Sequence, residues 1–404
     1  MGKAQLKPAV NEEKRRKQNG ITHLDYVKAA NEFGYEFRLN VLEDALEVNG
    51  QRMSNVVDAE IICHLHAKGL RNVDLARRAF LTDANSNHHH PVKGYLQSLE
   101  WDGIDHIAGL ARYFTDNHDL ITYADGTQRT VIHAWLLRWL IGSVAKVYNS
   151  QDAQNPMLVL DGGQGRGKSY FVKWLASPVA GMHFEGSIRP DDKDYLRYLS
   201  TRWIWEVSEL GATMRKADRE ALKAFITLQD VTYRPAHGQY VLHKPALANF
   251  IGTVNFEGAL LNDPTGHRRF MPVEIVDLDW EYAKNIDVNQ VWAQAYHLYR
   301  SGVSWKLTDN EKTVHLAICE HYEVEDVLEG HLREWFKIEP QNENLFTRTT
   351  AIIHHLKTYA GVSGRDRALT MQVAATLNKL GLRKGRKEHN RGYIGIEPVD
   401  TPNR

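Results

Sequence analysis

Cysteine, net charge and long apolar runs are all scarce in this chain. Only two of its 404 residues are cysteine, and they lie far apart, outside any spacing typical of a metal site. The plain interpretation is two reduced thiols in a cytosolic protein. The 50 lysines and arginines balance 50 aspartates and glutamates, so total charge argues neither for nor against nucleic acid, although it can hide a basic patch. No apolar run approaches the ~20 residues of a membrane span.

The N-terminal segment is polar and basic and no apolar core follows it. This pattern argues against a secretory signal, so we expect a cytoplasmic protein without a membrane partner. Residues 1–20 have no hydrophobic pattern and are predicted to be a disordered tail. Short strands are predicted at Phe37–Leu42 and Ala45–Val48, with helices capped by Ser54 and by Asp74.

The pattern changes twice along the middle of the chain. Asp83–Pro91 is typical of a loop, and helical periodicity then dominates Val92–Tyr148. Over residues 157–276 strands and helices alternate, which predicts an α/β fold with helices covering a sheet. After Asp279 the pattern is helical again, and the last seventy residues or so indicate a separate small module.

A glycine-rich loop follows the apolar strand Met157–Leu160 and precedes an amphipathic helix. It fits G-x-x-x-x-G-K-S, the P-loop motif, in the strand–loop–helix context that the motif requires; a merely flexible glycine loop is the alternative. Backbone N–H groups of such a loop point at phosphate oxygens, and the helix N-terminus favours negative charge. Lys168 would reach the β- and γ-phosphates of ATP, and Ser169 would bind Mg²⁺. The predicted nucleotide-binding residues are Gly162, Gly163, Gln164, Gly165, Arg166, Gly167, Lys168, Ser169 and Tyr170.

A P-loop ATPase also needs a carboxylate near Mg²⁺ and a group that orients water. Glu206 ends an apolar strand and is predicted to hold the Mg²⁺ water shell, while Glu209 follows where it would polarise the attacking water. Asn255 ends a third strand, from which its side chain would touch the γ-phosphate or its water. Two solvated acids and a turn-forming asparagine are the plain alternatives.

Arg268 and Arg269 stand together in a predicted loop. An arginine that reaches the γ-phosphate of a neighbouring subunit is the arginine-finger device, so this pair is a candidate finger. A surface basic pair is the alternative.

Two basic segments are candidates for DNA binding. Between the second and third strands, two β-prone stretches flank a turn, and this aromatic, basic hairpin suits a single strand. Near the C-terminus, helices starting at Thr349 or Thr350 and at Thr370, followed by a basic hairpin, form a winged-helix pattern that predicts phosphate contacts. The predicted residues are Arg234, His237, His243, Lys244, Arg383, Lys384, Arg386 and Lys387. A structural hairpin and a solvated charge run are the alternatives.

Three other groups of residues are assigned structural roles. The histidines His88–His90 are expected in a loop, because consecutive side chains do not converge easily on one metal ion. Cys63 and its neighbouring histidines are expected on a helix rather than in a zinc site. Four tryptophans are expected in the core: Trp135, Trp139, Trp203 and Trp205.

Taken together, four segments resemble the virulence-associated protein E family and follow one another in the same order as in that family. The family comprises phage and mobile-element ATPases related to superfamily III helicases of the AAA+ class. The segments are Pro91–Gly103, the P-loop, Glu206–Leu210 and Asp263–Phe270. The resemblance implies a ring, a hexamer, that hydrolyses ATP at subunit interfaces and serves replication of a mobile element. The resemblance covers about residues 90–275. Together with the pattern along the chain, it predicts a disordered tail (1–20), a small α+β domain (21–90), a helical collar for oligomerisation (91–150), the P-loop ATPase core (151–280), a helical extension (281–335) and a winged-helix-like module (336–404).

By position, Lys168 and Ser169 match the Walker A pair, and Glu206 and Glu209 match the two acids. Asn255 matches the sensor after the third strand, and the basic hairpin lies where related helicases carry a DNA-gripping hairpin. The acids stand three residues apart rather than side by side, which leaves the catalytic base open between them. Many relatives carry a primase domain upstream; the first 90 residues are too few for one, so priming would come from another protein.

The leading hypothesis is therefore a ring-forming ATPase that moves along or unwinds DNA. One rival is a P-loop kinase of a small molecule, active as a monomer with an arginine-bearing lid. The other rival is a DNA-binding initiator or repressor that uses the nucleotide as a switch and does not unwind DNA.

Overall fold

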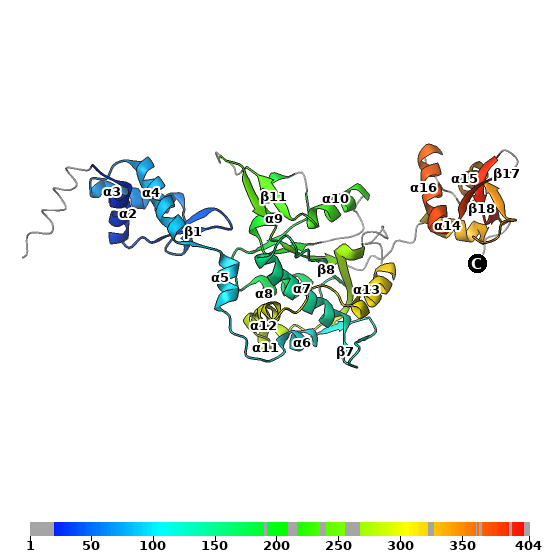
Figure 1. Ribbon diagram of the computed structural model, residues 1–404, viewed down its shortest axis with the longest axis horizontal. Helices are drawn as coiled ribbons and strands as arrows, with labels where there is room; N and C mark the ends of the chain where they lie inside the picture. The colour runs from blue at the N-terminus through cyan, green and yellow to red at the C-terminus, as the bar shows by residue number, and fades with distance from the viewer. Residues whose placement is uncertain are drawn as a thin grey trace, which may run out of the picture. The chain divides into compact units, whose positions relative to one another are not determined.

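The computed structural model describes residues 20–189, 192–208, 216–234, 240–254, 267–321, 327–360, 362, 366–387 and 390–399. Their contacts form two compact units, one built from Met1–Phe256 and Arg268–Leu316 and the other from Glu257–His267 and Ala317–Arg404 (Figure 1). The predicted tail 1–20 lies outside the described residues except for Gly20.

Three helices and a small sheet begin the first unit. The sheet has the order β3-β2-β1-β4, and Phe37 stacks on Phe80 in the core with ring centroids 4.2 Å apart. Ser54 caps its helix as predicted. The elements are α2 (His23–Glu32), β1 (Phe37–Asn40), β2 (Ala45–Val48), β3 (Gln51–Arg52), α3 (Asn55–Ala67), α4 (Val73–Ser86) and β4 (His88–His89).

Two predictions in this region are wrong. Asn72, not Asp74, caps α4, because its side chain accepts a hydrogen bond from the Leu75 amide at 3.0 Å. The expected loop Asp83–Pro91 is mostly helix and strand, since α4 continues to Ser86 and His88–His89 pairs with β1. Buried alanines of α4 packed against β1 extend the helix, a tertiary contact that local sequence does not reveal.

The first unit contains a six-stranded sheet in the order β5-β14-β8-β13-β10-β9. Five strands run parallel, and β5 pairs antiparallel with β14. The strands are β5 (Phe114–Asp116), β8 (Met157–Asp161), β9 (His183–Glu185), β10 (Ile204–Val207), β13 (Asn249–Val254) and β14 (Phe270–Leu278). Every residue of β8 and β13 is buried, which explains the apolar run Met157–Leu160 of β8.

Helices cover both faces of this sheet. Figure 1 places α7, α8 and α12 on one side and α9 and α10 on the other. The predicted core tryptophans are buried, and Trp135 and Trp139 donate their indole N–H groups to Pro272 and Phe250 carbonyls. The helices are α5 (Pro91–Ser98), α6 (His106–Ala111), α7 (Val131–Tyr148), α8 (Lys168–Ala176), α9 (Lys193–Thr201), α10 (Lys216–Ile226), α11 (Tyr282–Asn285), α12 (Val288–Arg300) and α13 (Asp309–His321). None of the helices in the described ranges is both long and apolar enough to span a bilayer.

The expected helical stretch Val92–Tyr148 is interrupted by strands. Phe114 of β5 is buried at one edge of the main sheet, so packing rather than local pattern decides its conformation. Two short strands, β6 (Ile121–Thr122) and β7 (Gln128–Arg129), then form a ribbon. Strands of two residues are too short to show any periodicity.

The predicted hairpin between the second and third sheet strands is confirmed. Strands β11 (Asp230–Tyr233) and β12 (Leu242–Pro245) pair antiparallel, with Val231 opposite Lys244. Tyr233 is buried in this hairpin, whereas Tyr240 is exposed. His237, predicted at its turn, lies outside the described residues.

In the second unit, three helices share an apolar core with two small sheets. The three-stranded sheet has the order β16-β18-β17, and β15 pairs with β19. Its elements are α14 (Val327–Trp335), β15 (Phe336–Ile338), β16 (Phe346–Arg348), α15 (Thr349–Tyr359), α16 (Asp366–Lys379), β17 (Arg383–Lys387), β18 (Asn390–Ile394) and β19 (Ile396–Pro398). The predicted basic hairpin is confirmed as β17–β18.

The predicted helix starts in this unit need correction. Arg348 occupies the N-cap position of α15, without a capping side-chain hydrogen bond, so neither Thr349 nor Thr350 is the cap. Thr370 lies inside α16 because that helix already begins at Asp366. Buried Leu369 precedes Thr370, so the apolar face that packs into the core starts earlier than the sequence indicated.

Candidate functional site

The glycine-rich loop joins the end of β8 to the start of α8. Gly165 and Gly167 both have positive φ angles, of 80° and 83°, and Gly167 is the N-cap of α8. Glycine adopts these angles without strain, which lets the chain curl directly into the helix N-terminus. The predicted strand–loop–helix is thus confirmed as a local structure.

Gly162 is required for a different reason, the close approach of a neighbouring strand. A Cβ atom at this position would lie 2.4 Å from the backbone oxygen of Ile275 in β14, and the φ angle is 153°. Gly163 has no such neighbour, because a Cβ there would meet only the Arg166 side chain at 3.8 Å. The first glycine therefore joins the loop tightly to β14, and the second does not.

Lys168 lies within the curve of this loop. Its Nζ donates hydrogen bonds to the carbonyl oxygens of Gly162 at 2.5 Å and Gly163 at 3.0 Å, and only 6% of the residue is exposed. Burial lowers the pKa of the ammonium group, an effect that the charge of Asp161 opposes. The loop thus surrounds a cation, the group needed to neutralise phosphate charge.

Two contacts from the end of β14 flank the loop. Arg166 forms an exposed ion pair with Asp277, with 2.9 Å between Nη1 and Oδ1. Trp280, just beyond the strand, packs on Gly167 and stacks on Tyr170. The predicted residues Arg166 and Tyr170 therefore meet side chains from a distant part of the sequence.

Glu206 is completely buried on β10, two strands away from β8. Neither of its carboxylate oxygens has a hydrogen-bond partner among the described residues. The imidazole of His183 on β9 lies beside it, with Nε2 3.4 Å from Oε2 and without a hydrogen bond among the described residues. Buried polar atoms are almost always satisfied, so an unsatisfied carboxylate indicates a ligand such as water or a cation. Glu206 thus suits the predicted Mg²⁺ role, with Ser169 at the second position of α8.

The strand β13 lies between β8 and β10 in the sheet. β13 pairs with both β8 and β10, and Val254, its last residue, lies opposite Asp161. Parallel strands have their carboxyl ends at the same edge, where ligands of α/β sheets bind. The predicted residues Glu209 and Asn255 themselves lie outside the described residues.

Arg268 and Arg269 lie at the opposite edge of the sheet. They precede Phe270, the first residue of β14, which pairs with Met157 at the start of β8. The five residues of β8 separate this edge from the P-loop, a distance of about 16 Å at ~3.3 Å per residue. The two predicted parts of the site are therefore far apart within one chain.

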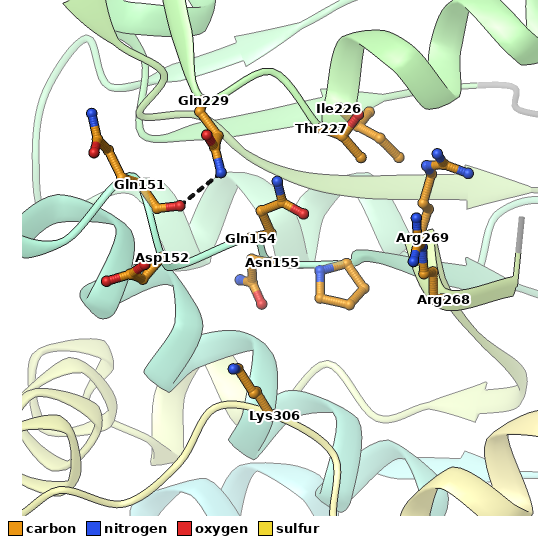
Figure 2. A pocket seen from close by; sticks show the side chains of 11 residues that line it. Gln151, Asp152, Gln154, Asn155, Ile226, Thr227, Gln229, Arg268, Arg269 and Lys306 are labelled. Carbon is orange, nitrogen blue, oxygen red and sulfur yellow. Dashed lines mark hydrogen bonds between the residues drawn. The ribbon is translucent and has the colours of Figure 1, made fainter.

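The arginines line a polar cavity of about 600 Å³ (Figure 2). Lys306 faces it from another segment, and Gln229 donates a hydrogen bond to the Gln151 carbonyl at 2.8 Å on its far side. The Nε atom of Arg269 is buried without a hydrogen bond among the described residues. Three cationic side chains around a polar hollow are suited to an anion. The lining residues are Gln151, Asp152, Gln154, Asn155, Pro156, Ile226, Thr227, Gln229, Arg268, Arg269 and Lys306.

The family model of the Virulence-associated protein E-like domain matches residues 96–324, which is more than half of the chain and includes the glycine-rich loop and the six-stranded sheet. This chain belongs to the virulence-associated protein E-like family. Among solved structures it is similar to the apo structure of the NrS-1 C-terminal region (305–718), at 14% identity over 93% of this chain and 99% of that one, with a TM-score of 0.47. The A-form apo structure of the same region matches at 13% identity over 93% and 100% of the chains, also with a TM-score of 0.47. No curated protein matches.

In the β11–β12 hairpin of this VapE-like chain, only some of the basic side chains are exposed. Arg234 and His243 are exposed, and His243 Nδ1 lies 2.9 Å from the Thr232 hydroxyl. Lys244, also predicted to bind DNA, instead donates hydrogen bonds to the carbonyls of Val41 and Leu42 at 3.0 and 2.7 Å and pairs with Asp44. The turn after β1 therefore holds one end of the hairpin.

The second unit of the VapE-like chain carries the other basic cluster on an exposed strand. The predicted residues Arg383, Lys384, Arg386 and Lys387 are all exposed on β17. Arg386 lies directly opposite exposed Arg391 of β18. Within this cluster Arg383 pairs with Glu343, and Lys387 donates a hydrogen bond to the Asn344 carbonyl at 3.3 Å.

The sequence prediction missed His183, Asp277 and Trp280. Asp277 and Trp280 follow the P-loop by more than a hundred residues and meet it only through the pairing of β14 with β8. His183 could have been suggested by its place at the start of a short strand near Glu185. Its contact with the predicted residue Glu206 was not predictable, because it depends on the pairing of β9 with β10.

Proposed function

We propose that this VapE-like chain is a Mg²⁺-dependent ATP hydrolase that acts on DNA as a ring, in the replication of a phage, satellite or other mobile element. The observation that carries the proposal is the pairing of a P-loop around Lys168 with a fully buried, unsatisfied Glu206 on the same sheet. An exposed glycine loop alone would not need such a carboxylate.

The roles follow from the chemistry of each side chain. Loop amides and Lys168 would hold the triphosphate, while Ser169 and Glu206 would hold Mg²⁺, which supplies charge neutralisation between the phosphates. Glu209 and Asn255 would orient the attacking water beyond the strand ends. His183 lies beside Glu206 on the neighbouring strand, with 3.4 Å between Nε2 and Oε2.

The position of the arginines favours a ring over a monomeric kinase. A kinase lid must bring its arginines to the phosphates of the same chain, but Arg268 and Arg269 begin a strand that runs parallel to β8, so they lie at the far edge. If they act on a γ-phosphate, that phosphate belongs to another subunit. The cavity beside them gives a neighbouring site room to approach.

Strand order also supports an AAA+ type of core. Counted along the chain from the P-loop strand, the order β14-β8-β13-β10-β9 is 5-1-4-3-2, with a strand inserted between the P-loop and the acid-bearing strand. This insertion is the arrangement expected of AAA+ ATPases. It creates room for a polar group between the phosphate and the acid, the role assigned above to Asn255.

DNA binding is proposed at two places. The β11–β12 hairpin would contact a single strand through Arg234, His237 and His243, with Tyr240 exposed for stacking. The helices and basic β17–β18 hairpin of the second unit form a winged-helix-like module for duplex phosphates.

A second candidate is a DNA-binding initiator or repressor that uses the nucleotide only as a switch. The exposed basic β17 favours it, because this strand could bind duplex DNA whether or not ATP is hydrolysed. The two candidates differ in whether Glu206 is needed for biological activity.

Calorimetry and steady-state turnover with Mg²⁺ and ATP test the proposal. Lys168→Ala is expected to abolish ATP binding, whereas Glu206→Gln should keep binding and lose turnover by roughly a hundredfold or more. The matched controls are Lys173→Ala, on the same helix as Lys168, and Glu185→Gln, on β9 opposite Glu206. Lys173 and Glu185 form an exposed ion pair with each other, so neither substitution should change ATP binding or turnover. Folded wild-type protein that takes up no adenine nucleotide would refute the proposal, and full biological activity of Glu206→Gln would favour the switch.

A further inference from the structure

Two exposed aromatic rings stand beside the P-loop. Trp280 is 52% exposed and Tyr170 is 50% exposed. Their rings are stacked, with centroids 5.6 Å apart and planes inclined by 10°. Tyr170 is the third residue of α8, and Trp280 follows β14, so two sequence-distant elements build one stacked aromatic pair at the loop.

The backbone around Trp280 fixes the position of its indole. The Asp279 amide donates a hydrogen bond to the Tyr113 carbonyl at 2.8 Å, and the Trp280 carbonyl accepts one from Ala283 at 3.2 Å. The indole lies so close to Gly167 that a Cβ atom there would be 2.8 Å from Cε2. An ordered, half-exposed tryptophan packed on a phosphate-binding loop is unlike a randomly placed surface residue.

We propose that Trp280 and Tyr170 form the platform on which the base of the bound nucleotide stacks. The inference rests on the proposed function and adds how the site selects its nucleotide. In a nucleotide the base follows the α-phosphate through the ribose, so it leaves the cradle beside the first turn of α8, where Tyr170 stands. The aromatic pair lies there, and the flat face of either ring matches the flat face of a base.

Stacking recognises the ring rather than the groups on its edge. Every base offers a π-face, so this platform favours a large purine over a pyrimidine and distinguishes weakly between adenine and guanine. The chain is therefore expected to bind ATP and GTP within a few-fold of each other and CTP more weakly. A site that accepted only adenine would need hydrogen bonds to the edge of the base.

The test compares nucleotides with inorganic tripolyphosphate, which has the phosphates but no base. Binding to the full chain is measured with Mg²⁺ for wild type, Trp280→Ala and Trp280→Phe. Trp280→Ala should weaken ATP and GTP about ten- to a hundredfold and leave tripolyphosphate within about twofold. Trp280→Phe should restore most of the lost affinity, because phenylalanine keeps a stacking face. Tyr359→Ala, a similarly exposed aromatic in the second unit, is the control and should change nothing.

Each result has a distinct meaning. Wild type that binds neither ATP nor tripolyphosphate overturns the proposed function itself. Wild type that binds both, with Trp280→Ala unchanged for ATP, overturns the platform alone. Equal weakening of ATP and tripolyphosphate by Trp280→Ala also overturns it, because the indole would then only shape the loop. Loss of single-stranded oligonucleotide binding without loss of ATP binding overturns it in favour of a DNA base on the same rings.

Discussion

Two adjacent glycines of the P-loop play different parts. Gly162 is held against the backbone of Ile275, while Gly163 faces open space apart from the Arg166 side chain. The motif treats only the first as fixed, and the structure supplies the reason: β14 passes too close for any side chain at position 162.

This difference predicts unequal costs of adding one methyl group. Gly162→Ala should destabilise the protein by about 1–3 kcal/mol, because the methyl group would overlap a backbone oxygen that cannot move without shifting β14. Gly163→Ala, the matched control, should change the free energy of unfolding by less than about 0.5 kcal/mol. Thermal unfolding of both variants is the measurement, and equal melting temperatures would contradict the close approach.

The buried helix α7 is attached to α13 by a charged cluster. Arg138 donates two hydrogen bonds to Glu311, from Nε at 2.9 Å and Nη2 at 3.1 Å. Tyr123 and the Thr308 amide donate two more, at 2.7 and 2.8 Å. Burial alone would raise the pKa of Glu311, but these hydrogen bonds outweigh it and lower the pKa below 4.5.

The cluster predicts an acid-dependent loss of stability. Because the folded pKa is lowered, Glu311 stabilises the fold above pH 4.5, and this contribution disappears as pH falls through the folded value. Glu311→Gln should cost about 3–5 kcal/mol at neutral pH by leaving Arg138 buried and unpaired, and its stability should vary less with acid. Denaturant unfolding from pH 7 to pH 3 measures both effects.

Glu281→Gln provides the control for that experiment. Its carboxylate is exposed and pairs with Lys284 one turn later, so the change in unfolding free energy should stay below about 1 kcal/mol. A Glu311→Gln variant with the same acid profile as wild type would show that another carboxylate governs the transition.

Elements were predictable where their own pattern was strong. The P-loop helix, the strands β8 and β13 and both hairpins follow from apolar runs and turn residues. The strand β5 inside an expected helical stretch and the extension of α4 to Ser86 were not predictable, since each depends on packing against a distant element.

At the scale of the whole molecule, the first unit cannot bring its arginines to its own P-loop. Parallel pairing of β14 with β8 fixes Arg268 and Arg269 at one edge and Lys168 at the other. If these arginines complete the proposed nucleotide site, that site belongs to a second chain, as in a closed ring with head-to-tail contacts.

This geometry predicts complementation between inactive chains. Arg268→Ala or Arg269→Ala should lose turnover by roughly a thousandfold while keeping ATP binding. Mixing either with Lys168→Ala in equal amounts should restore up to about a quarter of wild-type turnover, because that fraction of interfaces joins an intact loop to intact arginines. Turnover of the mixture is compared with the sum of the two variants measured separately, and no gain would exclude sharing between subunits.

The sequence by itself determined the glycine-rich loop between β8 and α8, because its consecutive residues have conformations that are set locally by glycine and by the helix that follows. It also determined the positions of the basic hairpins. Only the tertiary structure decided which residues meet this loop and which do not. Strand order and direction bring Trp280 to Gly167, bury Glu206 beside His183 and place the arginines at the opposite edge, and these depend on pairing between residues far apart in the chain.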